Sequence, residues 1–328
     1  IDVDPADTWI SFSIAGIGDR TSEYGIIWPD RLQQSGDLVL AGGRTDTLVF
    51  TISTTGSTAG TALINGKVTA VDINSSETVT DDTYTGGGSY IFVQNPALPV
   101  VLSSLASRDH VTSGQTTPWT VTLHVQNQGE AVMTLAADST YLFADYALAV
   151  PSPPSIFVEG GGSLAAGESK HLVFNISGAP VIETGYDLDI DARTGFFEDN
   201  SGAFLRYDTG ESGTGGTSVR VQAQANLRIA RLAGVLPNLP RANRGQRFPI
   251  VVEVENNGEA TAGQVNIGLA GDGSSTVENS PLTVVSVPGF ESATDTFHVT
   301  AADVEGIETF IADLASAVDV NSGQEGLF

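Results

Sequence analysis

The sequence contains no cysteine, and it has only 14 lysines and arginines against 39 aspartates and glutamates. Without cysteine no disulfide can form, so stability must come from hydrophobic cores and turns alone. The formal net charge of −25 disfavours binding to nucleic acid or to an anionic membrane surface. It fits a secreted protein kept soluble by repulsion, while adaptation to high salt or a need for a divalent cation stays open. No apolar run approaches the about 18 residues that cross a bilayer, so we expect no membrane insertion.

Signatures of catalysis are missing as well. There is no cysteine nucleophile and no G-x-S-x-G motif, and the four histidines (His110, His124, His171 and His298) are scattered along the chain. The alternation of their neighbours places His124 and His298 on the outward side of strands. We therefore expect a protein that is not an enzyme and that holds no cofactor, apart from the calcium considered below.

The sequence does contain short runs in which apolar and polar residues alternate. The pattern extends from Trp119 to Val125 and recurs over 172–176, 186–190 and 219–224. A period of two places one face of a strand on a core and the other in water, as in antiparallel sheets. Turn-forming clusters such as Asn127-Gln-Gly129 separate the runs. The pattern predicts an all-β fold.

The chain repeats itself with a period of about 125–130 residues. Leu164–Ser177 resembles Leu40–Ser53, and Trp119–Ala131 lies over Phe248–Ala260. Such a period is too long for a solenoid unit and suits a string of independently folded domains. We therefore expect three domains, over 1–96, 97–224 and 225–328.

The repeat traced over 99–224 holds six or seven short strands, which is typical of an immunoglobulin-like sandwich. The predicted fold class is thus tandem immunoglobulin-like antiparallel β-sandwiches. Three motifs lie in the second and third repeats: Asn226-Leu-Arg-Ile, the run Val-Val-Glu-Val-Glu-Asn-Asn ending at Gly258, and Leu164-Ala-Ala-Gly-Glu-Ser169. They resemble the bacterial cell-adhesion-related Ig-like domain (CARDB) family over residues 99 to the end, although Phe290 replaces the glycine in the third repeat. The family supplies spacers, adhesin parts and enzyme appendages alike, so the resemblance implies a fold and leaves the function open.

Both ends of the chain fall inside a repeat. Ile10–Gly16 lies over Val265–Gly271, so the first domain lacks its front strands, and the third has no counterpart of Ser218–Gln224. A segment of a longer protein, strands supplied by neighbouring molecules, and a diverged first domain are the open explanations. In the second case Ile1–Asp4 or Trp9–Ile14 would fill a neighbour's groove and build a fibre.

Two kinds of surface site are predicted. Asp187, Asp189 and Asp191 alternate along one predicted strand and share a face, which suggests a calcium site because hard cations take converging oxygens. Plain solvated carboxylates are the alternative. Asn74-Ser-Ser and Asn175-Ile-Ser match the N-glycosylation sequon and predict sugar attachment in an organism with the machinery.

Positive charge gathers in one stretch, which we call the arginine collar. No acidic residue lies between Ser212 and Arg247, and no lysine or arginine follows Phe248. The collar consists of Arg220, Arg228, Arg231, Arg241, Arg244 and Arg247. It is interpreted either as charge matching within the chain or as a contact for an acidic neighbouring subunit or polysaccharide.

These observations favour an extracellular or cell-surface protein with a structural or adhesive role. The first hypothesis is a surface stalk or self-assembling filament subunit, whose partners are copies of itself or neighbouring domains of a longer chain. The alternatives are an adhesin for a polysaccharide or host protein, which an aromatic-lined concavity would favour, and the non-catalytic accessory region of a larger secreted enzyme. The residues expected in the cores are Trp119, Leu123, Phe174, Ile176, Phe248 and Phe297.

Overall fold

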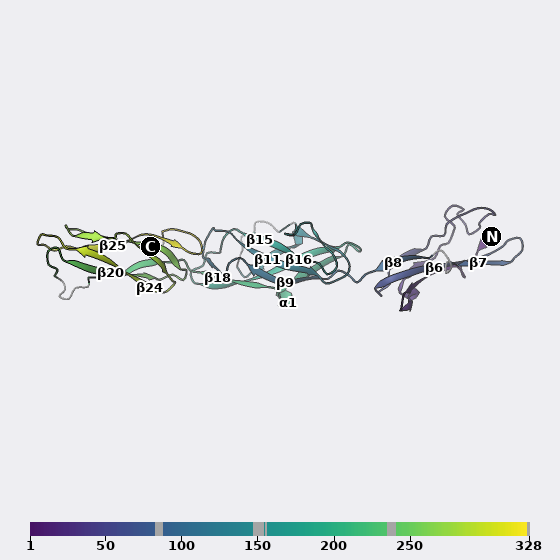
Figure 1. Ribbon diagram of the computed structural model, residues 1–328. Coiled ribbons are helices and arrows are strands. Elements are labelled where there is room, and N and C mark those ends of the chain that lie inside the picture. Colours follow the sequence, from purple (N-terminus) through teal and green to yellow (C-terminus); the bar gives the residue numbers. More distant parts are fainter. Residues whose placement is uncertain (83–87, 147–153, 155, 235–240, 327–328) are drawn as a thin grey trace. The chain divides into compact units, whose positions relative to one another are not determined.

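The computed structural model describes residues 1–82, 88–146, 154, 156–234 and 241–326. Antiparallel sheets make up nearly all of the regular structure, which confirms the all-β fold (Figure 1). The helical elements of these residues are the single turn α1 (Thr209–Ser212) and the 3-10 turns η1 (Thr21–Glu23) and η3 (Ala137–Ser139). Within the described ranges no helix has the length and apolarity needed to cross a membrane. The chain divides into two compact units, Ile1–Pro96 and Ala97–Phe328.

The first unit is built around one long strand, β6 (Gly60–Val71). Strands β1 and β2 pair with one edge of β6, and β7 and β8 pair with the other. A small core lies between this sheet and the two-stranded β4–β5 sheet, where Phe12 stacks on Tyr24 with 3.8 Å between ring centroids. The strands are β1 (Asp2–Val3), β2 (Trp9–Ile14), β3 (Gly18–Asp19), β4 (Gly25–Ile27), β5 (Thr51–Thr54), β7 (Thr78–Asp82) and β8 (Ser89–Val93).

Both segments predicted as donor strands are paired inside this unit. Asp2 and Val3 lie opposite Val71 and Ala70 of β6, and Trp9–Ile14 forms β2 between β6 and β3. The first segment is held further by backbone hydrogen bonds of Val3 and Ile1 with Leu38 and Leu40. In this structure both segments are paired within their own unit, and head-to-tail donation by these residues stays a prediction.

The second unit contains two sandwiches, each with its own core. In the middle sandwich, β15–β11–β9 faces a larger sheet ordered β10–β18–β16–β12–β14, to which β13 and β17 add along β16. The pairing is antiparallel except between β10 and β18. The strands are β9 (Pro99–Ala106), β10 (His110–Thr112), β11 (Trp119–Asn127), β12 (Met133–Leu135), β13 (Tyr141–Ala144), β14 (Ser163–Leu164), β15 (Ser169–Ile176), β16 (Tyr186–Glu198), β17 (Phe204–Asp208) and β18 (Thr217–Gln222).

The third sandwich follows with a four-stranded sheet, β19–β20–β24–β22, facing β23–β21–β25 (Figure 1). Its core begins at Ala225, so the predicted boundary near 225 lies between the two cores of one compact unit. The six residues expected in the cores are all buried, with Phe248 the most exposed at 8%. The strands are β19 (Leu227–Gly234), β20 (Arg247–Asn256), β21 (Ala262–Gly271), β22 (Thr276–Glu278), β23 (Leu282–Val287), β24 (Ser292–Thr300) and β25 (Phe310–Asp319).

The repeated Asn-x-Gly motif has the same structural task in both sandwiches. The Asn127 side chain is fully buried, and its amide donates to the carbonyls of Ala131 (2.8 Å) and Leu164 (3.2 Å). Its oxygen accepts from the N–H groups of Leu98 (3.1 Å) and Gly129 (3.0 Å). Asn256 makes the same four bonds, with Ala260, Val287, Asn226 and Gly258. One amide thus joins a strand end to a neighbouring turn in each copy.

One edge of the third sandwich carries no strand in the described residues. β25 pairs with β21 and, beyond that, only through a bridge from Val318 to Glu325. In the middle sandwich the corresponding edge of β16 is covered by β17 and β18. The Val318–Glu325 bridge corresponds to the pair Phe197–Phe204, where β17 begins.

Candidate functional site at the seam between the two sandwiches

The middle and third sandwiches are joined by polar contacts, which we call the seam. On one side of it, Arg220 of β18 donates from Nε to Oε1 of Glu259 at 3.0 Å. Glu259 lies on the turn between β20 and β21, and its side chain is only 15% exposed. Its second oxygen accepts from the N–H of Ala223 at 3.2 Å, and its own N–H donates to the Ala223 carbonyl. A single carboxylate therefore holds both a side chain and the backbone of the preceding sandwich.

Gly258 lets this turn approach closely. A Cβ atom at this position would lie 2.0 Å from the Gln224 carbonyl oxygen and 2.7 Å from the Cα atom of Ala225. Both are backbone atoms and cannot swing aside. The motif that ends at Gly258 therefore also sets how tightly the connecting segment packs on the third sandwich.

The other side of the seam is formed by the turn after β25. Asp319 is fully buried, and its Oδ1 accepts from the hydroxyl of Thr112 at 2.8 Å. Asn321 donates from its amide to Oε1 of Gln222 at 2.7 Å, and its carbonyl accepts from Arg108 at 2.6 Å. Strands β10 and β18 of the middle sandwich are thereby linked to the third.

Four members of the arginine collar pair with carboxylates of the same chain. Arg220 bonds Glu259 and, at 3.3 Å, Asp187. Arg228 pairs with Glu255, Arg244 with Glu305, and Arg247 with Glu278. Much of the collar's charge is thus matched within residues 187–305. For Arg231 and Arg241, the predicted contact with an acidic neighbour stays a prediction.

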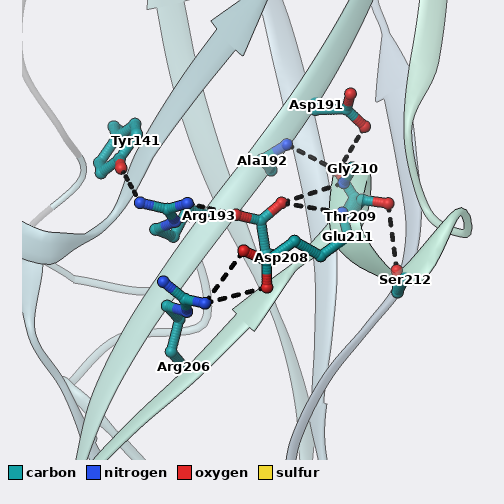
Figure 2. A network of polar contacts seen from close by, with 10 residues as sticks. All are labelled: Tyr141, Asp191, Ala192, Arg193, Arg206, Asp208, Thr209, Gly210, Glu211 and Ser212. Atoms are coloured by element: carbon teal, nitrogen blue, oxygen red, sulfur yellow. Dashed lines mark hydrogen bonds and ion pairs between the residues drawn. The ribbon is translucent and has the colours of Figure 1, made fainter.

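The three aspartates proposed to bind calcium lie along β16, each with different surroundings. Asp187 contacts Arg220, and Asp189 is exposed opposite Ser218. Asp191 accepts from the hydroxyl of Thr209 at 2.8 Å (Figure 2). Across the described ranges, no three acidic, histidine or cysteine side chains converge as metal ligands would. A calcium site at these residues stays a prediction.

Close to Asp191, Arg193 and Asp208 form an ion pair in which the Asp208 side chain is buried and that of Arg193 is 30% exposed. Asp208 is the N-cap of α1, and Oδ1 accepts from the N–H groups of Gly210 and Glu211 at 3.1 and 3.2 Å (Figure 2). Its Oδ2 accepts from Arg193 at 2.8 and 2.6 Å. Burial raises the pKa of Asp208, but these hydrogen bonds outweigh it, so the net pKa is lowered. The pair is structural, because every polar atom of the carboxylate is already used.

The remaining predicted sites lie on the surface. Asn74 is exposed in the turn between β6 and β7, and Asn175 is exposed on β15. His124 and His171, distant in sequence, are cross-strand neighbours with stacked rings 4.6 Å apart. Glu159 accepts from the N–H of His171 at 2.9 Å, which lowers the pKa of Glu159 to about 2. Access for glycosylation exists, and modification stays a prediction.

The seam residues were not found by sequence reasoning. Arg220 was singled out for its charge, but its partner Glu259 was only one of many carboxylates. Asp319 and Asn321 carry no motif of their own, although Asn321-Ser-Gly matches Asn200-Ser-Gly in the preceding repeat. The match between the repeats identifies this turn as a recurring feature, but it does not identify the surface of the middle sandwich that the turn contacts.

No protein-family model and no curated protein matches this chain. Two solved structures are similar at a TM-score of 0.21: the secreted serine protease VesC from Vibrio cholerae and a protein of unknown function from Porphyromonas gingivalis W83. The protease is 12% identical, and the match covers 67% of this chain and 51% of the protease, about half its length. The second is 13% identical over 66% of this chain and 93% of the other. At this TM-score neither structure carries an inference, and the resemblance to the CARDB family stays a prediction.

Proposed function

We propose that this chain is a structural spacer of an extracellular or cell-surface protein, in which Ig-like sandwiches are joined into a stalk. The seam is the observation that supports this role. A spacer transmits position from one end to the other only if successive domains do not swing freely. Interfaces between domains of one chain are usually mobile unless they are large and hydrophobic, so a fixed joint requires specific contacts.

The contacts of the seam are suited to fixing the angle between the middle and third sandwiches. Two contact sites, one at Glu259 and one at Asp319, restrain rotation better than a single hinge. Exposed ion pairs contribute little, but Asp319 is fully buried and Glu259 is mostly so, which makes loss of a partner costly. The donors and acceptors also have fixed directions, so few relative orientations satisfy them.

The absence of cysteine makes this joint directly measurable. Ser103 on β9 and Thr294 on β24 are exposed, and cysteines placed there would be the only attachment points for spin labels. Pulsed electron paramagnetic resonance on the full chain should give one narrow distance distribution. The substitution Glu259→Ala, combined with Asp319→Ala, should broaden it severalfold. The matched control Glu255→Ala removes an ion pair inside the third sandwich and should leave it narrow. A broad distribution in the unmodified chain would contradict a stalk with a fixed joint.

A second candidate function, self-assembly, is favoured by the uncovered edge of β25. A concavity of about 840 Å³ lies at the start of β25. Its lining combines the apolar side chains of Leu232, Phe248, Ile250 and Phe310 with the charged side chains of Arg241, Arg244, Glu305 and Glu308. In the middle sandwich, β18 occupies the corresponding place and buries Val219 and Val221 completely. An unpaired edge strand beside a groove that offers apolar side chains is a template for strand addition. We propose that its occupant is an extended segment with alternating valines, like β18.

This candidate is tested with a labelled peptide that copies residues 216–223. Binding to the full chain, followed by fluorescence anisotropy, should be abolished when the two valines of the peptide are replaced by aspartate. Sedimentation of the chain alone at rising concentration then measures whether it self-associates, as expected if another copy supplies such a strand. A peptide that does not bind, or that binds regardless of its valines, would remove the support for assembly through this edge.

A further inference from the structure

The first unit contains a concavity that none of the sites described above uses. Its volume is about 510 Å³, and residues of strand β2 form one of its walls. The residues that line it are Trp9, Ile10, Ser11, Ser13, Asp19, Thr21 and Trp28. Two of the three tryptophans of the chain therefore meet at one surface depression, whereas the third, Trp119, is in a core at 2% exposure.

The β structure explains why these side chains converge. Trp9, Ser11 and Ser13 alternate along β2, so they share one face of the sheet. The register places Asp19 of β3 directly opposite Ser13, on the same face. The backbone of β2 is held between β3 and β6, so this side of the concavity is a rigid surface.

Trp28 forms another part of the lining. It follows β4, and its ring meets Phe50 edge to face with 5.6 Å between centroids. Although Phe50 holds it in place, Trp28 is 48% exposed. A large indole with half its surface in water is not a core residue, and exposed aromatic surface of this kind commonly contacts ligands.

The polar groups of the concavity are largely unused. Among the described residues, the hydroxyls of Ser11 and Ser13 have no hydrogen-bond partner. Asp19 accepts from Thr21 through Oδ1, at 2.9 Å from its N–H and 2.6 Å from its hydroxyl. These bonds lower the pKa of Asp19, so the carboxylate is ionised at neutral pH. No lysine or arginine belongs to the lining.

We propose that this concavity binds a neutral hexose polysaccharide. The rings of such a polymer present apolar C–H faces, which stack on indole rings, and hydroxyls at their edges, which bond serine and carboxylate oxygens. The Asp19 carboxylate, in a lining that itself holds no lysine or arginine, disfavours uronic acids and sulfated sugars, as does a net charge of −25. A flat apolar ligand would cover the hydroxyls of Ser11 and Ser13 without supplying hydrogen-bond partners, which disfavours it.

This inference does not rest on the stalk function, because the concavity lies in the first unit and the seam in the second. It adds an adhesive activity to the structural one. The two fail separately: a flexible joint leaves sugar binding intact, and absence of sugar binding leaves the joint distances unchanged.

The test uses the full chain with soluble hexasaccharides. Cellohexaose, maltohexaose and mannohexaose are the neutral probes, and hexagalacturonate is the anionic one. Binding is followed by isothermal titration and by the fluorescence of Trp9 and Trp28. We expect at least one neutral probe to bind and the anionic probe not to bind.

Variants then place the binding in the concavity. Trp28→Ala should weaken it tenfold or more, and Trp9→Ala should do the same. Ser13→Ala, a smaller change that leaves both indoles, should weaken it severalfold. The matched control is Phe92→Ala, because Phe92 is 70% exposed on the same unit but does not line the concavity. Unchanged melting temperatures show that the variants fold.

Three results would overturn the proposal. The first is that no neutral probe binds the unmodified chain. The second is that Trp28→Ala and Ser13→Ala, both folded, bind as well as the unmodified chain. The third is that Phe92→Ala weakens binding as much as Trp28→Ala, which would indicate general aromatic adhesion without a defined site.

Discussion

At the scale of single residues, the two sandwiches depend on a few buried polar side chains as much as on their apolar cores. Asn127 and Asn256 each satisfy four backbone groups that would otherwise be buried without partners. Such a group costs about 1–3 kcal/mol when it is left unpaired. The asparagine of the repeated motif is therefore explained by folding, without reference to a ligand.

Replacing Asn127 by alanine removes all four bonds of this network. We expect the middle sandwich to lose about 3 kcal/mol of unfolding free energy, since some of the freed groups would regain water. Urea denaturation, followed through Trp119 in a background of Trp9→Phe and Trp28→Phe, measures this. The adjacent Gln128 is exposed, and Gln128→Ala should change stability by less than about 0.5 kcal/mol. A loss below about 1 kcal/mol for Asn127→Ala would show that the network is dispensable.

The hydrogen bonds to Glu159 predict a dependence of stability on pH. The N–H and the ring of His171 lower the pKa of Glu159 from 4.5 to about 2 in the folded protein. A carboxylate with a depressed folded pKa stabilises the fold fully above about pH 4.5, and this contribution is lost as the pH falls toward 2. Glu159→Gln should lower stability at pH 7 and flatten the decline between pH 4.5 and 3. Glu183→Gln, at an exposed carboxylate of the same sandwich, is the control. Parallel curves for Glu159→Gln and the unmodified chain would contradict this assignment.

At the scale of elements, those strands were predictable that have one face in the core and the other face exposed to solvent. The run from Trp119 to Val125 lies within β11, whose residues alternate between buried and half-buried along its full length. The alternating runs over 172–176 and 186–190 lie within β15 and β16, and the run over 219–224 begins in β18. Burial of every second residue requires apolar and polar residues to alternate in the sequence, so these strands could be predicted from short stretches of sequence alone.

Other elements could not be predicted in this way. Residues 301–309 form no strand, and β25 begins only at Phe310. The described strands of the first unit form one six-stranded sheet and one two-stranded sheet, whose pairing the local pattern did not indicate. Its concavity joins β2 to Trp28, which lies outside any strand, and loop positions are set by tertiary contacts that a local pattern does not encode.

The core face assigned to β15 leads to a quantitative prediction. Phe174 is fully buried opposite Val121 of β11, whereas its neighbour Asn175 points outward. Phe174→Ala should cost roughly 3–5 kcal/mol, through lost burial and the cavity left behind. Asn175→Ala should cost under about 0.5 kcal/mol. Urea denaturation of both variants checks the contrast, and equal effects would mean that the inward face of β15 is misassigned.

At the scale of the whole molecule, charge is distributed so that it joins neighbouring sandwiches. A net charge of −25 favours expansion, yet Arg220 lies where the third sandwich presents Glu259. The sequence shows the imbalance between an arginine-rich stretch and an acid-rich domain. It does not show that four of the six arginines find partners in their own chain, because those pairs span about 30–60 residues and depend on the fold.

The seam should couple the unfolding of the two sandwiches that it joins. If Glu259 and Asp319 hold them together, Ala97–Phe328 unfolds in one calorimetric transition, separate from that of Ile1–Pro96. Removing one partner from a buried polar contact costs about 3 kcal/mol, so Glu259→Ala combined with Asp319→Ala should split this transition into two. Salt should shift the coupling at Glu259 more than that at Asp319, because an ion pair is screened and a hydroxyl–carboxylate bond less so. Arg228→Gln, which removes an ion pair within the third sandwich, should lower that transition slightly without splitting it. A single transition that persists in the double variant would mean that the sandwiches are coupled by something other than the seam.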